Sequence, residues 1–342
     1  MAAYKKNRFP RWQPLLRERR RGGRRLIEEE NMKIYRVIPG HLGAVLSIAV
    51  DPNNSWFCTG SADRTIKIWD LTSGRLKHTL TGHTDYVQGL AVSSKHTKLF
   101  SVGDDEQVKC WDLELNKAIR SYDDHGGVWC LALPPTIDNI FLTGGRDFVC
   151  RVWDIRIKEM QVQKLTGHED AVHSILTPAT DPQVVTGSED STIKYWDLRY
   201  GKSMLTLTHH ESSVHAMALH PKEESFASVS DDNMKKFSLP RGEFMHDMPC
   251  PKKTIFSMAV NEEGVLTGAG IDGSLSFWDW RSGHNFQHAP TGSLPSEACI
   301  YDLAYDSTGS RLITCEADKT IKMWKEDETV TPETHHPSFQ AS

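Results

Sequence analysis

The stretch GSADRTIKIWDLTSG, residues 60–74, alternates apolar and polar side chains as far as Trp69-Asp70 and then ends in a Ser-Gly turn. The chain contains six more phrases close to this one. Their Trp positions lie 41 to 46 residues apart, at Trp69, Trp111, Trp153, Trp196, Phe237 (a Phe in a Trp slot), Trp278 and Trp324. Self-similarity at a period of this size indicates a set of equivalent small units that pack against one another.

Each repeat shows the two-residue hydrophobic period of short strands. In the first repeat this period predicts strands over residues 45–50, 56–61, 65–71 and 75–80, separated by turn formers. A lone four-stranded sheet leaves both of its faces half apolar, and radial stacking covers those faces all the way round a ring. The sequence therefore predicts an all-β fold, a seven-bladed β-propeller.

The two ends of the chain predict how the ring closes. After Trp324 only Lys-Glu-Asp and a polar tail follow, so the seventh blade lacks a fourth strand. The segment KIYRVI, residues 33–38, precedes the first Gly-His and can supply that strand, which would leave no open sheet edge. We therefore expect a basic N-terminal arm (1–32), a propeller (33–325) closed by strand 33–38, and a polar C-terminal tail (326–342).

Polar residues recur at fixed offsets in the first four repeats. In each of them a His lies 28 residues before the Trp, a Ser or Thr lies ten residues before it, and an Asp lies six residues before it. This pattern resembles that of WD-repeat proteins, in which the four side chains of one blade form a hydrogen-bonded chain ending at the indole N–H. The resemblance implies a structural network of His41, Thr59, Asp63, Trp69, His83, Ser101, Asp105, Trp111, His125, Thr143, Asp147, Trp153, His168, Thr186, Asp190 and Trp196.

The last three repeats depart from this pattern. The fifth has His210 but Phe237 in the Trp slot, with Asp232 only five residues upstream of it. The sixth and seventh have Pro251 and Ser296 where the His would stand. We expect these three blades to depend more on apolar packing.

The composition and motifs argue against several classes of function. The longest apolar run, residues 128–133, is six residues long, whereas about 20 are needed to cross a bilayer, so we expect no membrane span or secretion signal. The seven cysteines form no CxxC pair and indicate buried thiols in a reducing compartment. The sequence lacks GxSxG, HExxH and Walker motifs, and the pairs at 209–210 and 335–336 are the only adjacent histidines. We expect no metal, no cofactor and no catalysis.

Charge is distributed unevenly along the chain. Residues 1–25 carry ten Lys or Arg and one Glu, whereas residues 26–342 carry 30 basic and 44 acidic side chains. The arm can be a solvated, disordered tail, a nuclear-import signal, or a segment that contacts RNA phosphates and orders on its partner. The candidates for contact with RNA or an acidic partner are Lys5, Lys6, Arg8, Arg11, Trp12, Arg19, Arg20, Arg21, Arg24 and Arg25.

Residues outside the repeat pattern resemble one family. The runs YRVIPGHLG (35–43), QVKCWDLELNKAIRSY (107–122) and WDWRSGHNFQ (278–287) look like the pleiotropic regulator family of spliceosomal WD-repeat proteins. The tail EDETVTPETHHP (326–337) also resembles that family, and propeller geometry does not explain it. The resemblance covers about residues 33–337.

The resemblance implies a non-catalytic scaffold in the nucleus, part of the Nineteen complex, that positions partners around the catalytic core of the spliceosome in pre-mRNA splicing. The implied partners are a Myb-repeat splicing factor, an SNW-domain protein and other Nineteen complex members. Small nuclear RNA or pre-mRNA is a candidate for contact through the arm. A different class stays open, namely a substrate receptor of a ubiquitin ligase or a histone-tail reader, although no F-box-like module accompanies the propeller.

Candidate partner-binding residues lie on the face that carries the turns next to the recurrent Asp positions and the loops after each Gly-His. They are Arg64, Tyr86, Asp104, Trp129, Arg146 and Glu189. The alternative interpretation is that they are solvated turn residues or, for Trp129, a core aromatic.

Overall fold

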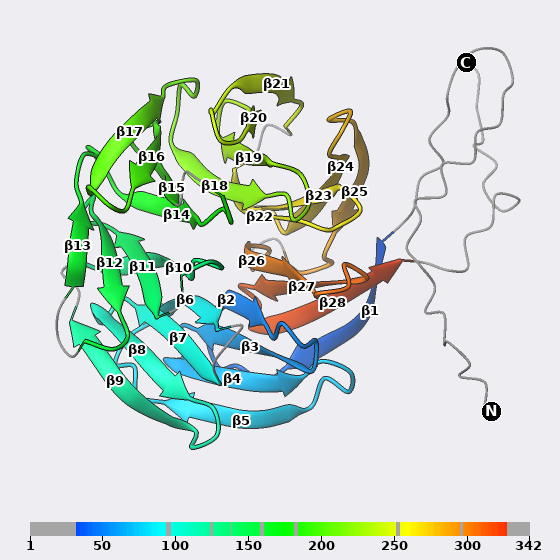
Figure 1. The fold of residues 1–342 in the computed structure, drawn as a ribbon. Coiled ribbons are helices and arrows are strands. Elements are labelled where there is room, and N and C mark those ends of the chain that lie inside the picture. The colour runs from blue at the N-terminus through cyan, green and yellow to red at the C-terminus, as the bar shows by residue number, and fades with distance from the viewer. Residues whose placement is uncertain are drawn as a thin grey trace, which may run out of the picture.

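The computed structural model describes residues 32–93, 97–123, 126–137, 139–157, 161–180, 184–250, 254–294 and 297–326. These residues form seven four-stranded antiparallel sheets arranged as a ring, which confirms the predicted seven-bladed all-β propeller (Figure 1). None of the described residues forms a helix long and apolar enough to cross a bilayer. The arm residues 1–31, the tail residues 327–342, and His125, Pro251 and Ser296 lie outside the described part of the chain.

The blades are numbered 1 to 7 in chain order, and each begins with its innermost strand. Blades 1 to 3 comprise β2 (Val45–Val50), β3 (Trp56–Ser61), β4 (Thr65–Asp70), β5 (Leu76–Thr81); β6 (Val87–Val92), β7 (Lys98–Gly103), β8 (Gln107–Asp112), β9 (Lys117–Asp123); and β10 (Val128–Ala132), β11 (Ile140–Gly145), β12 (Cys150–Asp154), β13 (Gln161–Leu165). Blades 4 and 5 comprise β14 (Val172–Leu176), β15 (Val184–Ser188), β16 (Ile193–Asp197), β17 (Lys202–Leu207); and β18 (Val214–Leu219), β19 (Ser225–Ser230), β20 (Met234–Ser238), β21 (Phe244–Met248). Blades 6 and 7 comprise β22 (Ile255–Val260), β23 (Val265–Gly270), β24 (Ser274–Asp279), β25 (Asn285–Pro290); and β26 (Ile300–Tyr305), β27 (Arg311–Glu316), β28 (Thr320–Glu326) with β1 (Met32–Pro39).

The ring closes through the first strand of the chain. β1 pairs antiparallel with β28, with Ile34 opposite Trp324 and Ile38 opposite Ile321, and so becomes the outer strand of blade 7. Figure 1 shows the blue β1 beside the red end of the chain. β1 begins at Met32 and β28 ends at Glu326, one residue outside each expected propeller boundary.

A buried carboxylate adds a second tie at the closure, one that sequence reasoning missed. Asp302 of β26 accepts hydrogen bonds from the Ile48 N–H of β2 (2.9 Å) and from the Ser257 hydroxyl of β22 (2.8 Å). It therefore joins the inner strands of blades 6, 7 and 1. Desolvation raises the pKa of Asp302 to about 6, because it outweighs the hydrogen bonds that lower it.

The apolar core of the described residues consists of seven clusters, each lying between two neighbouring blades. At the closure, Phe57 and Trp69 of blade 1 pack with Ile313 and Met323 of blade 7, and Ile38 of β1 joins them. Burying one such aliphatic or aromatic side chain contributes about 1.5–3 kcal/mol. Each blade therefore depends on both neighbours for the burial of its two faces.

The glycine of the recurrent Gly-His phrase has a steric cause. A Cβ on Gly40 would lie 2.6 Å from Cη2 of Trp69, and one on Gly82 would lie 3.2 Å from Cη2 of Trp111. Gly82 also has a φ of +153°, a conformation that side-chain-bearing residues rarely adopt. In blades 1 and 2 the Trp thus occupies the space beside the loop that carries the His.

The seven cysteines are free thiols, and four of them, Cys58, Cys110, Cys150 and Cys315, are buried. Burial raises the pKa of Cys110 to about 11, so this thiol stays protonated at neutral pH.

Deletion of residues 32–39 tests the closure. We predict that this variant aggregates or melts well below the full chain, because blade 7 loses its outer strand and Ile38 leaves the core between blades 7 and 1. Size-exclusion chromatography and thermal unfolding followed by circular dichroism measure both effects. Deletion of residues 1–25 is the matched control, and an equal loss of stability in the two variants would contradict the assignment.

Candidate functional site

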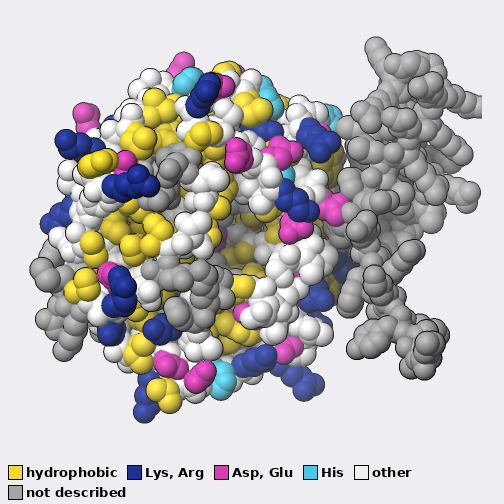
Figure 2. All heavy atoms as spheres, viewed as in Figure 1, with side chains coloured by type: hydrophobic (Ala, Val, Ile, Leu, Met, Phe, Trp, Pro, Cys, Tyr) yellow, Lys and Arg dark blue, Asp and Glu magenta, His cyan; other side chains and the backbone are white. Residues whose placement is uncertain are grey.

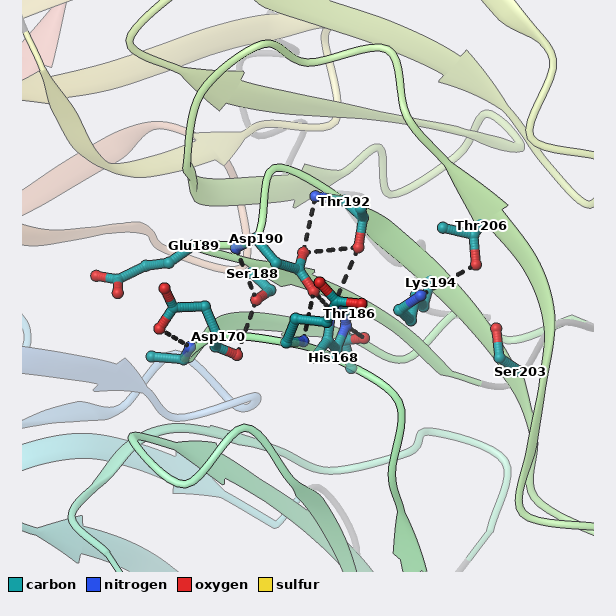
Figure 3. Close-up of polar contacts among 12 residues, drawn as sticks. His168, Asp170, Thr186, Ser188, Glu189, Asp190, Thr192, Lys194, Ser203 and Thr206 are labelled. Carbon is teal, nitrogen blue, oxygen red and sulfur yellow. Dashed lines mark hydrogen bonds and ion pairs between the residues drawn. The ribbon is translucent and has the colours of Figure 1, made fainter.

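Blade 4 contains all four members of the polar network, and Figure 3 shows the part around His168, Thr186 and Asp190. In blade 4, His168 lies 2.7 Å from both Asp190 Oδ2, through Nδ1, and Thr186 Oγ1, through Nε2. The indole N–H of Trp196 donates to the same Thr186 hydroxyl at 2.8 Å. Asp190 also accepts the backbone N–H of Glu169 at 3.0 Å. The chain of bonds joins the loop before the first strand to the turn and the third strand of the blade.

Blades 1 and 2 repeat this network with nearly the same geometry. In blade 1 the His41 ring lies 2.9 Å from Asp63 Oδ2 and 2.8 Å from Thr59 Oγ1, to which the Trp69 N–H donates at 2.9 Å. The corresponding partners in blade 2 are His83, Asp105, Ser101 and Trp111, with His–Asp, His–Ser and Trp–Ser distances of 2.8, 2.7 and 2.8 Å. These buried side chains hold one another and leave no site for a substrate among them.

Blade 3 keeps only part of the network in the described residues. Trp153 donates to Thr143 at 2.8 Å, as in the other blades. Asp147 pairs with Arg151, whose Nη2 lies 2.5 Å from its carboxylate. Since His125 lies outside the described residues, its predicted place in the network stays a prediction.

Blade 5 keeps the His–Asp pair without the Trp. His210 lies 3.0 Å from Asp232 and 2.7 Å from Ser228. Phe237 occupies the Trp slot, is fully buried, and stacks on Phe226 with ring centroids 5.3 Å apart. Apolar packing replaces the missing indole bond here, as expected.

Blades 6 and 7 use different substitutes, and the expectation that blade 7 depends more on apolar packing is wrong. In blade 6 the Trp278 N–H donates to the carbonyl of Pro249 at 2.8 Å. In blade 7 a buried ion-pair cluster takes the place of the His. Lys322 lies 2.5 Å from Glu316 and 3.1 Å from Asp318, and Glu316 accepts from Thr314, which holds the Trp324 N–H.

The recurrent carboxylates are held in their ionised form. Burial raises the pKa of Asp63, but hydrogen bonds from Thr65, the Leu42 N–H and His41 outweigh it and lower the pKa to about 2. The pKa of Asp232 is likewise lowered to about 2, and the pKa values of Asp105 and Asp190 are lowered by their His and backbone partners against the effect of burial. Burial lowers the pKa of His41 and outweighs the bond to Asp63, which raises it. The lowered pKa favours a neutral ring.

Every inner strand carries one extra residue at the same place. The register shifts by one residue near the start of β2, β6, β10, β14, β18, β22 and β26, which is the signature of a β-bulge. The residues at these shifts are Leu46, Gln88, Trp129, His173, His215, Phe256 and Tyr301. We call the end of the ring at which these seven residues lie the mouth; Figure 2 shows one face of the disc, with a hollow at the centre of the blades.

The mouth brings together five of the six predicted contact residues. Tyr86, Asp104, Trp129 and Arg146 line one cavity of about 820 Å³ between blades 2 and 3. The Arg146 guanidinium lies 5.9 Å from the centroid of the Trp129 ring. Glu189 lies one blade further on. Arg64, with φ of +68°, occupies the equivalent turn of blade 1 and does not line this cavity.

In blades 2 to 5 the bulge residue pairs with the residue that precedes the Asp of the turn. Gln88 donates to Asp104 at 2.8 Å, and Arg146 lies over Trp129. In blade 4 His173 Nε2 lies 2.8 Å from Glu189. In blade 5 His215 Nε2 lies 3.2 Å from Asp231. These pairs fix side chains that a partner would meet.

Sequence reasoning missed every bulge residue except Trp129, including His173, His215, Phe256 and Tyr301. A signal for them was present, since each follows the first buried residue of its inner strand, as Trp129 does. Within the described ranges, no group of three or more His, Cys, Asp or Glu side chains is placed to hold a metal ion. The arm residues from Lys5 to Arg25 lie outside those ranges.

The fold and the recurring His–Asp–Thr–Trp networks define a WD-repeat β-propeller. The family model "WD domain, G-beta repeat" matches residues 32–70, 74–112, 116–154, 159–197, 201–235 and 288–325. This family model does not match the residues between 235 and 288, which include Phe237 in the Trp slot of blade 5 and Trp278, whose N–H donates to a backbone carbonyl in blade 6. The stretch that departs from the repeat in sequence therefore also departs from the network geometry of blades 1, 2 and 4.

The chain is also similar to named full-length proteins. It is 65% identical over 313 residues to the pleiotropic regulator PRL2 of Arabidopsis thaliana, covering 90% of this chain and 65% of that protein. It is 51% identical over 312 residues to human pleiotropic regulator 1 (90% and 60% covered), and 45% identical over 308 residues to the pre-mRNA-splicing factor PRP46 of Candida glabrata (88% and 72%). The chain belongs to the pleiotropic regulator family of WD-repeat proteins, and it spans just under two thirds of the length of the first of these relatives.

The substitution Asp105→Ala tests whether the network supports the fold. It leaves His83 and the Thr84 N–H without an acceptor, and an unpaired buried group costs about 1–3 kcal/mol. We predict a lower melting temperature by differential scanning calorimetry. Asp104→Ala is the matched control because the Asp104 carboxylate bonds only the Gln88 side chain in the described structure, and an equal effect of the two changes would argue against the network.

The pH dependence of stability follows from the recurrent carboxylates. Their folded-state pKa values lie below the ordinary value of 3.8, so the stability that they contribute is present above pH 4 and is lost as the pH falls towards 2. Asp302, whose pKa is raised, acts with the opposite sign between pH 4 and 6. We predict that the melting temperature falls most steeply between about pH 4 and 2, and that Asp63→Asn makes this fall shallower; a slope unchanged by the substitution would contradict the assignment.

Proposed function

We propose that this protein is a non-catalytic scaffold of the spliceosome that acts in the nucleus, in pre-mRNA splicing, by positioning partner proteins around the catalytic core. The observation that supports this most is the similarity over about 90% of the chain to proteins named pleiotropic regulators and pre-mRNA-splicing factors. A similarity of this length and identity is more specific than the shared WD-repeat fold.

The geometry suits a scaffold. In blades 1, 2, 4 and 5 the His and Asp side chains bond each other in the same structural network. Because a reaction site is normally built once, repetition at the same offset in several blades fits a structural role better than a catalytic one. A closed ring also presents its loops and mouth with little loss of conformational entropy on binding. A partner therefore meets surfaces that are already ordered.

The proposed partners are a Myb-repeat splicing factor, an SNW-domain protein and other members of the Nineteen complex. We propose that no cofactor takes part and that the basic arm, residues 1–25, contacts small nuclear RNA or pre-mRNA, for which its ten Lys and Arg supply the charge. The ubiquitin-ligase and histone-tail alternatives have no observation in their favour and become outcomes of the test.

Affinity purification of the tagged chain from nuclear extract tests the proposal. We predict co-purification of spliceosomal small nuclear RNAs and of Nineteen complex proteins, detected by RNA sequencing and mass spectrometry. A cullin-type adaptor or nucleosomes in their place would overturn it. For the arm, we predict that deletion of residues 1–25 reduces crosslinking to RNA and its salt dependence, and unchanged crosslinking would remove the arm from the account.

A further inference from the structure

We propose that the mouth binds an extended segment of a partner protein that carries a Lys or Arg side chain close to an aromatic or large aliphatic one. This inference rests on the proposed function, since it names the chemistry of a partner that the scaffold holds. Its three supports are an aromatic arc, an apolar sector and an acidic sector of the same mouth.

Five consecutive bulge residues form a continuous arc of rings. The centroids of Trp129 and His173 are 4.8 Å apart, and those of His173 and His215 are 6.0 Å apart. Phe256 lies 6.4 Å from His215 and 6.4 Å from Tyr301. Because each ring comes from a different blade, the arc follows the mouth from blade 3 to blade 7 without a break.

The arc ends in an apolar sector. Phe256 and Tyr301 are stacked, with an interplanar angle of 19°, and are 36% and 38% exposed. The residue that precedes the turn Asp in blade 6 is Ile271, half exposed, where blades 2, 4 and 5 have a carboxylate. Large apolar side chains gathered at one site on a soluble protein indicate a surface that another molecule covers.

The other sector of the mouth is acidic. Asp85, Asp104 and Glu106 line the cavity of about 820 Å³ between blades 2 and 3, and no described cation forms an ion pair with them. Glu189 and Asp231 follow in blades 4 and 5, each beside the His of its own blade. Among the described residues that line this cavity, Arg146 is the only Lys or Arg, and it lies over Trp129.

These two sectors select the occupant by charge and by shape. The carboxylates attract a Lys or Arg side chain and repel the phosphates of a nucleic acid. The stacked pair at the other end of the arc takes an aromatic or aliphatic side chain. Since the bulge residues stand on paired strands and most contact a neighbouring side chain, the surface is ordered before the partner arrives.

Selection from a library of random 12-residue peptides displayed on phage tests the inference with the full chain. We expect the enriched peptides to combine Lys or Arg with an aromatic residue or Leu. A fluorescein-labelled synthetic copy of an enriched peptide is then titrated by fluorescence anisotropy. We expect binding to weaken about tenfold in the double variant Glu189→Gln/Asp231→Asn and by a similar factor in Phe256→Ala/Tyr301→Ala.

The matched control is Glu114→Gln/Glu243→Gln, which removes two exposed carboxylates from turns at the opposite ends of the strands. It should bind the peptide like the unaltered chain, and thermal unfolding verifies that all variants are folded. Enrichment of acidic peptides, no enrichment at all, an equal loss in the control, or displacement of the peptide by a 12-nucleotide oligouridylate with higher affinity would each overturn the inference.

The experiment separates this inference from the proposed function. If the unaltered chain co-purifies with spliceosomal small nuclear RNAs but selects no basic peptide, the mouth assignment fails and the scaffold stands. If basic peptides bind the mouth but the small nuclear RNAs are absent, the mouth assignment stands and the scaffold belongs to another assembly.

Discussion

The requirement that both faces of every blade be covered governs this structure. A four-stranded sheet of this sequence has two apolar faces, and the seven core clusters of the described residues lie between blades and not within one. Only a closed ring satisfies this for all blades at once, and closure depends on the pairing of β1 with β28, the two ends of the described chain. The hydrogen bond from Ile48 to Asp302 and the packing of Ile38 against blade 1 also hold blades 7 and 1 together.

The polar networks satisfy buried groups, and the blades reach that end by different means. Blades 1, 2 and 4 use the His–Asp and Trp–Ser/Thr bonds, blade 5 replaces the Trp by stacked Phe rings, and blade 7 buries Lys322 with Glu316. In the polar networks different side chains serve one structural purpose, whereas in the bulges one backbone feature carries side chains of different chemistry. One backbone device recurs in every inner strand, and the different side chains that it carries make the mouth aromatic and apolar on one side and acidic on the other. Architecture is repeated, whereas binding chemistry varies from blade to blade.

Much of the fold could be predicted because strand period, repeat length and turn residues are local signals. The offsets of His, Thr, Asp and Trp placed the contacts of blade 1 correctly, since four copies of the pattern gave the register. The ion-pair cluster around Lys322 could not be predicted, because no repeat shares it. His173, Phe256 and Tyr301 escaped because the residue that a bulge turns into the mouth is defined by strand register, which sequence period alone does not give.

Hydrogen exchange measured by mass spectrometry tests the closure of the ring most directly. β1 pairs with β28 over seven residue pairs from Met32–Glu326 to Pro39–Thr320, so its backbone amides on that side are bonded as those of a central strand are. The account predicts that, in a peptide spanning residues 32–39, the amides that face β28 exchange slowly and lose their protection together with β26 to β28 in urea, because β1 is the edge strand of this sheet. Exchange of residues 32–39 at the rate of an unstructured peptide, while β26 to β28 stay protected, would contradict it.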